Sequence, residues 1–423
     1  MPEKVFLPAD ILLPAEDIDM NAWSVIACDQ FTSQPEYWEK VEEIAGKRPS
    51  TLRLMLPEAF LAERDTEEEI KKVNAAMEEY LQGGVFRTAG HSYIYIERQL
   101  SGGSIRRGLM GVLDLEHYDY REDSQSLVHA TEGTVEERLP PRVKLRLGAK
   151  LEMPHIVVFI DDPEHTVIDP IMYHLEEPEK LYDFELMLSG GHVTGWRVGG
   201  DKARAVENAL LALEEPELLR EKYDLKGGEA PVVFAVGDGN HSLATAKLCW
   251  DRIKENLTPE EREGHHARYA LVELVNLHDS SIVFEPIHRV VFGVKSEEFF
   301  AAAGKFLQSM DRGEGEIHTV TLIAGEQRAD VAVRGLTIGE TIAAAEEFCT
   351  RFAGANGGKL DYIHGDDTAA GMAAKEDRGG MLLPPMDKKE LFSSIIHSGA
   401  FPRKSFSIGH AEDKRYYLEC REL

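Results

Sequence analysis

Hydrophobic and polar positions follow two different periods along the chain, and these periods predict helices and strands in alternation. Apolar residues recur with helical spacing over residues 66–81, where Thr66 is the expected N-cap and glutamates fill the first turn. Further helices are expected over residues 140–151, 201–213, 296–310, 341–352 and 387–397.

Runs of strand length, rich in Val, Ile and Tyr, lie between these helices. They occupy residues 92–98, 109–115, 155–160, 268–277 and 281–294. Two hairpins are expected, one over residues 182–198 and one over residues 405–419. This order of elements predicts an α/β or α+β protein in which mixed sheets carry flanking helices.

The length of 423 residues corresponds to two or three domains. We expect an N-terminal α/β region over residues 1–227, a continuation of the core over residues 228–294, and a C-terminal α+β region over residues 295–423. No low-complexity linker separates these regions, so the expected boundaries rest on glycines near positions 227 and 293.

The segment over residues 231–250 has the most distinctive chemical pattern. A short uncharged apolar run is followed by a glycine turn and then by a sequence of helical composition. The first N–H groups of a helix lack acceptors within it, and the helix dipole makes this end partially positive. The pattern therefore predicts an anion-binding turn, with Gly237, Gly239, Asn240 and Ser242 as contacts.

Two side chains of this turn are candidates for chemistry. Asp238 could act as a general base, a magnesium ligand or a helix cap, and His241 could bind a phosphate or transfer a proton. Asp, Asn and Ser are also common capping residues, so a purely structural turn is the alternative. The segment is neither a P-loop nor a dinucleotide-binding motif, because it has neither glycine pattern.

Composition and charge narrow the classes of function. The chain has 47 Lys and Arg against 75 Asp and Glu, and its net charge of −28 would repel nucleic acids and anionic membranes. No apolar run approaches the roughly 20 residues of a membrane-spanning helix. The four cysteines are far apart and no secretory signal is recognised, so we expect a cytoplasmic protein with free thiols and no metal cluster.

Several segments resemble, in the same order, the motifs of one family. Residues 237–242 are similar to a DGHHR signature, and residues 111–118 are similar to a GLVDLEDY strand. Residues 131–134 with 153–156 resemble an HExT segment followed by PIF, and residues 286–289 resemble PTHR. Over most of its length, the chain thus resembles the family of the domain of unknown function 1015.

This resemblance implies phosphate or nucleotide chemistry, because the DGHHR-type turn is also similar to the phosphate-contacting turn of ParB and sulfiredoxin-like folds. Those folds include nucleotide hydrolases and a small-molecule serine kinase. The resemblance further implies a catalytic or magnesium-binding role for Glu132, and ligand contacts for Thr134, His288 and Arg289. The alternatives are helix capping by Glu132 and Thr134, a half-buried His288, and a surface Arg289 in a salt bridge.

The chain departs from the family pattern at two places. Asn240 replaces a histidine of the signature, and Ser242 replaces an arginine that would bind phosphate bidentately. The N-terminal PPYD segment of the family keeps only Asp29. The candidates for a replacement cation are Arg289, Arg403 and Lys404.

Three hypotheses follow from these observations. The first is an enzyme of phosphoryl transfer or phosphate hydrolysis that acts on a small anionic metabolite or nucleotide, with magnesium a candidate cofactor. The second is a non-catalytic regulator that binds a nucleotide or metabolite, which the missing arginine favours. The third, a ParB-type DNA-binding protein, conflicts with the net charge and with the lack of a basic recognition helix. The sequence does not indicate an oligomeric state.

Overall fold

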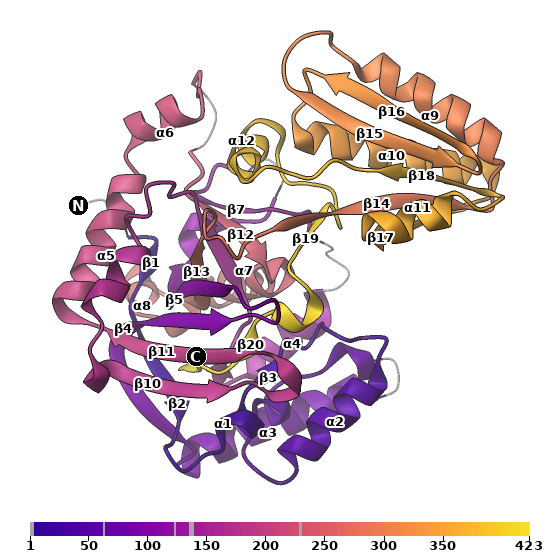
Figure 1. Cartoon of the computed structure of the whole chain (residues 1–423). Helices are drawn as coiled ribbons and strands as arrows, with labels where there is room; N and C mark the ends of the chain where they lie inside the picture. Colours follow the sequence, from indigo (N-terminus) through magenta and orange to yellow (C-terminus); the bar gives the residue numbers. More distant parts are fainter. Residues whose placement is uncertain (1–3, 62–63, 122–123, 135–138, 228–230) are drawn as a thin grey trace.

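The fold is mixed α/β, as the order of predicted elements indicated, and it is built on two large sheets (Figure 1). The computed structural model describes residues 4–61, 64–121, 124–134, 139–227 and 231–423. The larger sheet lies in the main body of the molecule, and the smaller one lies in the unit at the upper right of Figure 1.

The larger sheet mixes parallel and antiparallel strands drawn from most of the first 276 residues. Its strand order is β10 (Lys180–Glu185), β11 (His192–Val198), β4 (Phe86–Gln99), β5 (Ile105–Asp114), β13 (Tyr269–Asn276), β9 (Val157–Ile160), β12 (Phe234–Asp238), β7 (Val128–Ala130) and β6 (Tyr118–Asp119). Two strands at the N-terminus extend it, since β1 (Phe6–Leu7) pairs with β5 and β2 (Ala9–Pro14) pairs with β4. The strands β10 and β11 form the hairpin predicted over residues 182–198.

Helices flank this sheet. They are α1 (Met20–Trp23), α2 (Pro35–Ala45), α3 (Thr66–Gln82), α4 (Leu139–Gly148), α5 (Gly200–Leu213), α6 (Pro216–Lys222), α7 (Asn240–Lys254) and α8 (Pro259–Glu263). The helix predicted over residues 66–81 is confirmed as α3, but its N-cap is Asp65 and not Thr66, because the Asp65 carboxylate accepts the N–H groups of Glu67 and Glu68.

The smaller sheet is antiparallel, and its helices alternate with its strands along the chain. Its strand order is β16 (Gln327–Arg334), β15 (Ile317–Ala324), β18 (Arg378–Leu382), β14 (Phe284–Phe292) and β17 (Lys359–His364), with β19 (Phe406–Ile408) paired to β14. The helices of this part are α9 (Ser296–Met310), α10 (Ile338–Asn356), α11 (Asp366–Ala373) and α12 (Lys388–Ser398). The chain passes from the larger sheet to the smaller sheet between β13 and β14. The domain boundaries expected near 227 and 294 stay a prediction, and residue 228 lies outside the described residues.

The C-terminal segment leaves the smaller sheet and returns to the main body. There β20 (Tyr416–Tyr417) pairs with β3 (Val25–Ile26), and β21 (Arg421–Glu422) pairs with β8 (Leu151–Glu152). The hairpin predicted over residues 405–419 is therefore wrong. Each of its two halves pairs with a strand far away in the sequence, and such pairing leaves no local turn signal.

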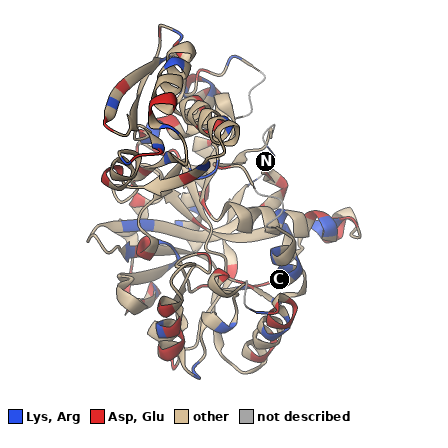
Figure 2. Cartoon of the chain, turned by 90° about the vertical axis from the view of Figure 1, so that its right-hand side faces the viewer, with Lys and Arg blue, Asp and Glu red and all other residues tan. Residues whose placement is uncertain are grey.

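Acidic and basic side chains are interspersed over the molecule. Figure 2 shows both colours on the same helices, which places opposite charges close together on their surfaces. No helix among the described residues is both long enough and apolar enough to cross a membrane.

Candidate functional site

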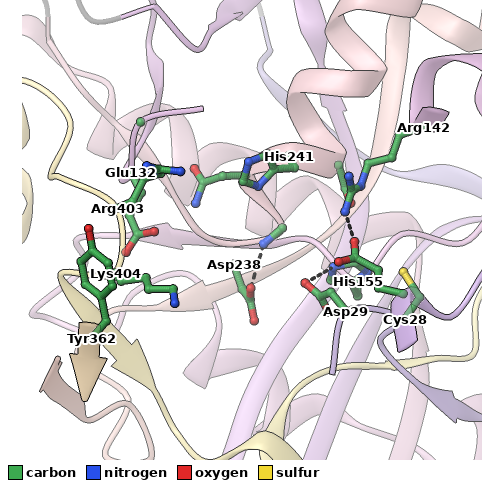
Figure 3. Close-up of a pocket in the computed structure, with 15 residues that line it drawn as sticks. Cys28, Asp29, Glu132, Arg142, His155, Asp238, His241, Tyr362, Arg403 and Lys404 are labelled. Atoms are coloured by element: carbon green, nitrogen blue, oxygen red, sulfur yellow. Dashed lines mark hydrogen bonds and ion pairs between the residues drawn. The ribbon is translucent and has the colours of Figure 1, made fainter. Parts of the chain in front are cut away.

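A cavity of about 340 Å³ lies at the start of α7 and is lined mainly by polar side chains (Figure 3). We call it the polar cavity. The residues that line it are Cys28, Asp29, Glu58, Glu132, Gly133, Arg142, His155, Asp238, Gly239, Asn240, His241, Ser242, Tyr362, Arg403 and Lys404.

Strand directions explain why these distant segments meet. The strands β7 and β12 are parallel and adjacent, so their carboxyl ends reach the same edge of the sheet. Glu132 follows β7, and Asp238 is the last residue of β12. The neighbouring strand β9 runs antiparallel to β12 and begins at this edge, which places His155 there as well.

The predicted strand–turn–helix is present, with Gly239 as the residue that joins β12 to α7. Its φ of 79° lies in the left-handed region, and a Cβ at this position would meet Ile156 Cα at 3.0 Å. Gly239 is also the N-cap, so no side chain caps the helix. The positive end of α7 therefore faces the polar cavity.

Asp238 lies in the wall of the polar cavity and does not cap α7. One carboxylate oxygen accepts the N–H of Gly239 at 2.9 Å, and the other lies 3.2 Å from Nζ of Lys414. In Figure 3 the Asp238 side chain lies between two groups, with Glu132, Arg403 and Lys404 on one side and Asp29 and His155 on the other.

Glu132 stands near Asp238 in a mostly buried position. Its carboxylate accepts the N–H of Ser405 at 3.3 Å. Burial raises the pKa of Glu132 to about 7, with a further contribution from the Asp238 carboxylate, while hydrogen bonds from the backbone of Lys404 and Ser405 oppose the rise. A carboxyl group with this pKa can exchange a proton near neutral pH.

Asp29 and His155 form a pair on the opposite wall. Nε2 of His155 lies 3.6 Å from the Asp29 carboxylate, and Nδ1 lies 2.8 Å from the Tyr417 hydroxyl. Burial alone would lower the pKa of His155, but the carboxylates of Asp29 and Asp238 outweigh it and raise the pKa. Burial opposes ionisation of Asp29 as well, yet His155 holds its pKa below the usual range. Asp29 is thus a carboxylate at neutral pH.

Cys28 borders this pair but is a poor candidate for a nucleophile. Burial, together with the neighbouring Asp29 carboxylate, raises the pKa of its thiol to about 11. The thiolate is the reactive form of cysteine, so Cys28 is in its unreactive form at neutral pH.

Arg403 and Lys404 supply exposed positive charge at the cavity. Nζ of Lys404 lies 5.0 Å from the centre of the Tyr362 ring. No ion pair joins either side chain to a carboxylate within the part of the chain that the structure describes. Two of the three expected replacement cations therefore face the polar cavity with their charge available to a ligand.

The third expected cation, Arg289, does not line the polar cavity. It is fully buried, with Nε 2.8 Å from a Glu346 carboxylate oxygen. Its guanidinium also donates to the backbone carbonyl of Lys404 at 2.8 Å and to that of Arg403 at 3.5 Å. Arg289 thus holds the backbone of the loop that presents the two exposed cations.

His288 is also buried and does not line the polar cavity. Its Nε2 lies 2.9 Å from Asp366, and its Nδ1 accepts the N–H of Leu383 at 3.0 Å. The expectation that His288 and Arg289 reach a pocket rim is not met, because α11 covers the face of β14 that carries His288 and α10 covers the face that carries Arg289.

The remaining predicted residues divide into two sets. Asn240, His241 and Ser242 line the polar cavity, and Nδ2 of Asn240 lies 3.4 Å from the Thr131 hydroxyl. Gly237 does not line the polar cavity. A Cβ at this position would meet the Phe159 ring at 2.3 Å, so close packing explains the glycine. Thr134 does not line it either, and the charged segment after it lies outside the described residues.

Several lining residues were not among the predicted site residues. They are Cys28, Asp29, Glu58, Gly133, Arg142, His155 and Tyr362. Asp29 had a signal as the retained residue of the N-terminal family motif, and His155 had one as a polar residue directly before a buried strand. Glu58, Arg142 and Tyr362 had no such signal. Glu58 lies in a short helix over residues 58–60, Arg142 in α4 and Tyr362 in β17, and no local pattern links these segments to the cavity.

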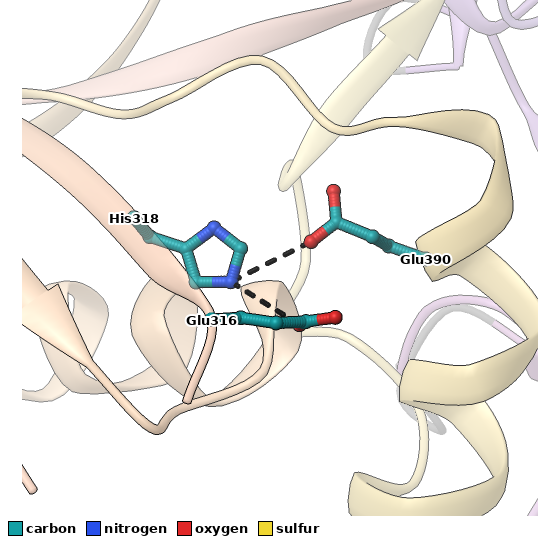
Figure 4. A group of neighbouring side chains, drawn as sticks. All are labelled: Glu316, His318 and Glu390. Atoms are coloured by element: carbon teal, nitrogen blue, oxygen red, sulfur yellow. Dashed lines mark ion pairs between the residues drawn. The ribbon is translucent and has the colours of Figure 1, made fainter. Parts of the chain in front are cut away.

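One group among the described residues offers three ligand atoms within 4.8 Å of one another, formed by Glu316, His318 and Glu390 (Figure 4). Nε2 of the buried His318 lies 3.5 Å from Glu390 and 3.9 Å from Glu316. These contacts connect β15 to α12. None of the three residues lines the polar cavity.

Comparison with known proteins identifies the family. A model described as protein of unknown function (DUF1015) matches residues 12–361. The chain belongs to this family. The resemblance noted in the sequence is confirmed at this level, and the family description supplies no activity. No curated protein matches the chain.

Solved structures that match the chain are distant. A conserved hypothetical protein from Pyrococcus furiosus has 12% identity and a TM-score of 0.34, with 74% of this chain and 94% of that chain covered. A free serine kinase in complex with AMP has 11% identity, a TM-score of 0.36, and coverages of 73% and 90%. C-terminally truncated SbnI from Staphylococcus aureus has 11% identity, a TM-score of 0.34, and coverages of 71% and 83%. Because these TM-scores are low, we infer the function from the polar cavity alone.

Proposed function

We propose that the polar cavity binds a small metabolite through a phosphate group and transfers or hydrolyses that phosphoryl group. The observation that carries this proposal is the meeting of the uncapped start of α7, two exposed cations and an acidic group with a pKa of about 7. Helix N-termini bind phosphates, and phosphoryl transfer depends on positioning and on neutralising charge.

The residues divide into plausible roles by position. The start of α7, with Asn240, His241 and Ser242, would hold the phosphate, and Arg403 and Lys404 would neutralise its charge from the opposite wall. Glu132 would take the proton of the attacking hydroxyl or water as the new P–O bond forms and the bond to the leaving oxygen breaks. The similarity of this turn to that of ParB and sulfiredoxin-like folds belongs to the same proposal.

Magnesium fits this arrangement as a companion of the phosphate. Mg²⁺ is usually bound through one or two carboxylates together with substrate phosphates and water. Asp238 and Asp29 offer such oxygen donors in the wall of the cavity, and Asp29 stays ionised. We include magnesium and a nucleotide among the candidate ligands.

The experiment that tests the proposal is a thermal-shift panel with ATP, ADP, AMP and pyrophosphate, each with and without magnesium. A ligand at about 100 times its dissociation constant should stabilise the protein by roughly 2.7 kcal/mol. With magnesium present, the variant Asp238→Asn should lose most of this stabilisation, because it removes a carboxylate proposed to hold the metal ion. The matched control is Asp251→Asn. Asp251 lies on α7 and, like Asp238, pairs with lysine, at 2.7 and 3.2 Å, but it does not line the polar cavity.

The outcome against the proposal is equally defined. If no phosphate compound stabilises the wild-type protein, or if Asp238→Asn and Asp251→Asn behave alike, the cavity is not a phosphate site. Binding in this panel without turnover of any bound compound would favour the second candidate, a regulator that binds a nucleotide or metabolite. The presence of Ser242 where the family has an arginine is the observation in favour of that candidate.

The proposal includes a cytoplasmic location. All four cysteines are free, and three of them, Cys249, Cys349 and Cys420, are buried. Unpaired thiols are typical of proteins in a reducing compartment, which supports this part of the proposal.

A further inference from the structure

A second cavity, of about 470 Å³, adjoins the polar cavity. We call it the apolar cavity. Five residues line both cavities, namely Cys28, Glu58, Arg142, His155 and Ser242. Because their walls are shared, one ligand could occupy both. Each volume lies within the range of about 300–1,000 Å³ that is usual for small-molecule sites.

The walls of the apolar cavity are mainly aliphatic. Methionines at positions 55, 77 and 153 line it together with leucines from α4 and from residues 54–61. Methionine side chains are flexible and polarisable, so they adapt to chains of different shape. The two rings among the described lining residues, those of Tyr417 and His155, pack edge to face against each other, and the Tyr417 hydroxyl is already bonded to His155 and Cys28.

The charged residues around the apolar cavity are paired with one another. Glu152 lies 2.6 Å from Arg146 and 2.6 Å from Arg421. Glu58 and Arg142 form an ion pair at the boundary with the polar cavity. These charges compensate each other, so the apolar cavity does not require a charged partner.

We propose that the natural ligand is a phosphate monoester of an aliphatic alcohol, with its phosphate in the polar cavity and its chain in the apolar cavity. This inference rests on the proposed function and specifies its substrate class. An aliphatic lining whose two rings pack against each other favours a flexible chain over a nucleobase, because bases bind by stacking on aromatic side chains. A nucleotide would fill the polar cavity and leave the apolar cavity without a matching group.

The test is isothermal titration of the wild-type protein with methyl, butyl and octyl phosphate, and with AMP as the nucleobase arm. Burial of one methylene strengthens binding by about fourfold. Octyl phosphate should therefore bind at least tenfold more tightly than butyl phosphate, and more tightly than AMP. Octanol, which has the chain without the phosphate, should bind weakly.

Two variants on the same helix separate the apolar cavity from general effects on α4. Leu145 lines the apolar cavity, whereas Leu147 is 46% exposed and does not line it. Leu145→Gln should weaken octyl phosphate at least fivefold and leave methyl phosphate unchanged. Leu147→Gln should bind both compounds as the wild-type protein does. If Leu145→Gln does not fold, the chain-length series on the wild-type protein decides alone.

The outcomes distinguish this inference from the proposed function. Equal affinity for methyl and octyl phosphate, or tighter binding of AMP than of octyl phosphate, would overturn the aliphatic ligand and leave the phosphate site standing. Octyl phosphate binding that Arg403→Met does not weaken would also overturn it, because the phosphate would then lie elsewhere. Failure of every phosphate probe to bind would remove the proposed function itself.

Discussion

The start of α7 and the His288–Arg289 pair of β14 carry similar residue types in very different surroundings. Around Asp238 the chain leaves a sheet at the end of a strand, and the side chains face a cavity. His288 and Arg289 lie in the middle of a strand whose two faces are covered by α11 and α10, and both are fully buried. A polar motif can thus face a cavity where its strand ends, whereas within a strand that helices cover on both faces it stabilises the structure.

The two regions are nevertheless connected through the loop at residues 403–404. Arg289 holds the carbonyl groups of this loop from behind, and the side chains of Arg403 and Lys404 face the polar cavity in front. Substitutions in β14 should therefore change the free energy of unfolding, and substitutions at the polar cavity should change ligand affinity.

Replacing Arg289 should have the largest effect on stability. Arg289→Met removes the buried guanidinium from Glu346 and from three backbone carbonyls, which should lower the free energy of unfolding by about 3–5 kcal/mol. Urea denaturation measures this change. Arg403→Met, an exposed arginine of the same loop, is the matched control and should change stability by less than about 0.5 kcal/mol. A loss below about 1 kcal/mol for Arg289→Met would contradict the structural role.

Glu132 should make stability depend on pH. Its pKa is about 7 in the folded protein against an ordinary value of 4.5, so the folded state holds a proton that the unfolded state has lost between these values. The stabilisation is complete below pH 4.5 and is lost as pH rises to about 7. Relative to Glu132→Gln, the wild-type protein should lose up to about 3 kcal/mol over this range in urea denaturation. Parallel curves for the two proteins would show that Glu132 has an ordinary pKa.

Arg403 should affect ligand binding and leave the fold intact. A hydrogen bond to a charged group contributes roughly 1.5–3 kcal/mol, so Arg403→Met should weaken pyrophosphate by about tenfold or more. Isothermal titration measures this loss. Unchanged affinity would place the phosphate away from the loop at residues 403–404.

The smallest effect is expected at Asp366. It is the partner of His288, but its side chain is 77% exposed, and such ion pairs contribute about 0–1 kcal/mol. Asp366→Asn should lower the free energy of unfolding by less than about 1 kcal/mol and leave pyrophosphate binding unchanged. A loss of ligand binding in this variant would bring β14 back into the functional site.

The sequence pattern predicted those residues around the polar cavity that are neighbours along the chain. Residues 237–242 are contiguous, and a strand, a glycine turn and a helix start can be recognised from such a segment alone. The cations at residues 403–404 were found because basic residues are conspicuous in an acidic chain. The fold class followed in the same way from the alternation of helices and strands.

The other parts of the site depend on pairing that no local signal reports. Arg142 and Tyr362 meet the start of α7 only because α4 packs on α7 and because β17 lies beside β14. The exposure of Arg289 was misjudged for a related reason, since the sequence of β14 does not say that helices cover both of its faces. The C-terminal strands pair with β3 and β8, which lie hundreds of residues away along the chain.

The central claim is that the polar cavity holds a phosphate at the start of α7. A crystal structure of the protein grown with pyrophosphate and magnesium tests it most directly. We expect a phosphate within hydrogen-bonding distance of the first backbone N–H groups of α7 and of Arg403 or Lys404. Pyrophosphate bound at another place, with only water in the polar cavity, would contradict it.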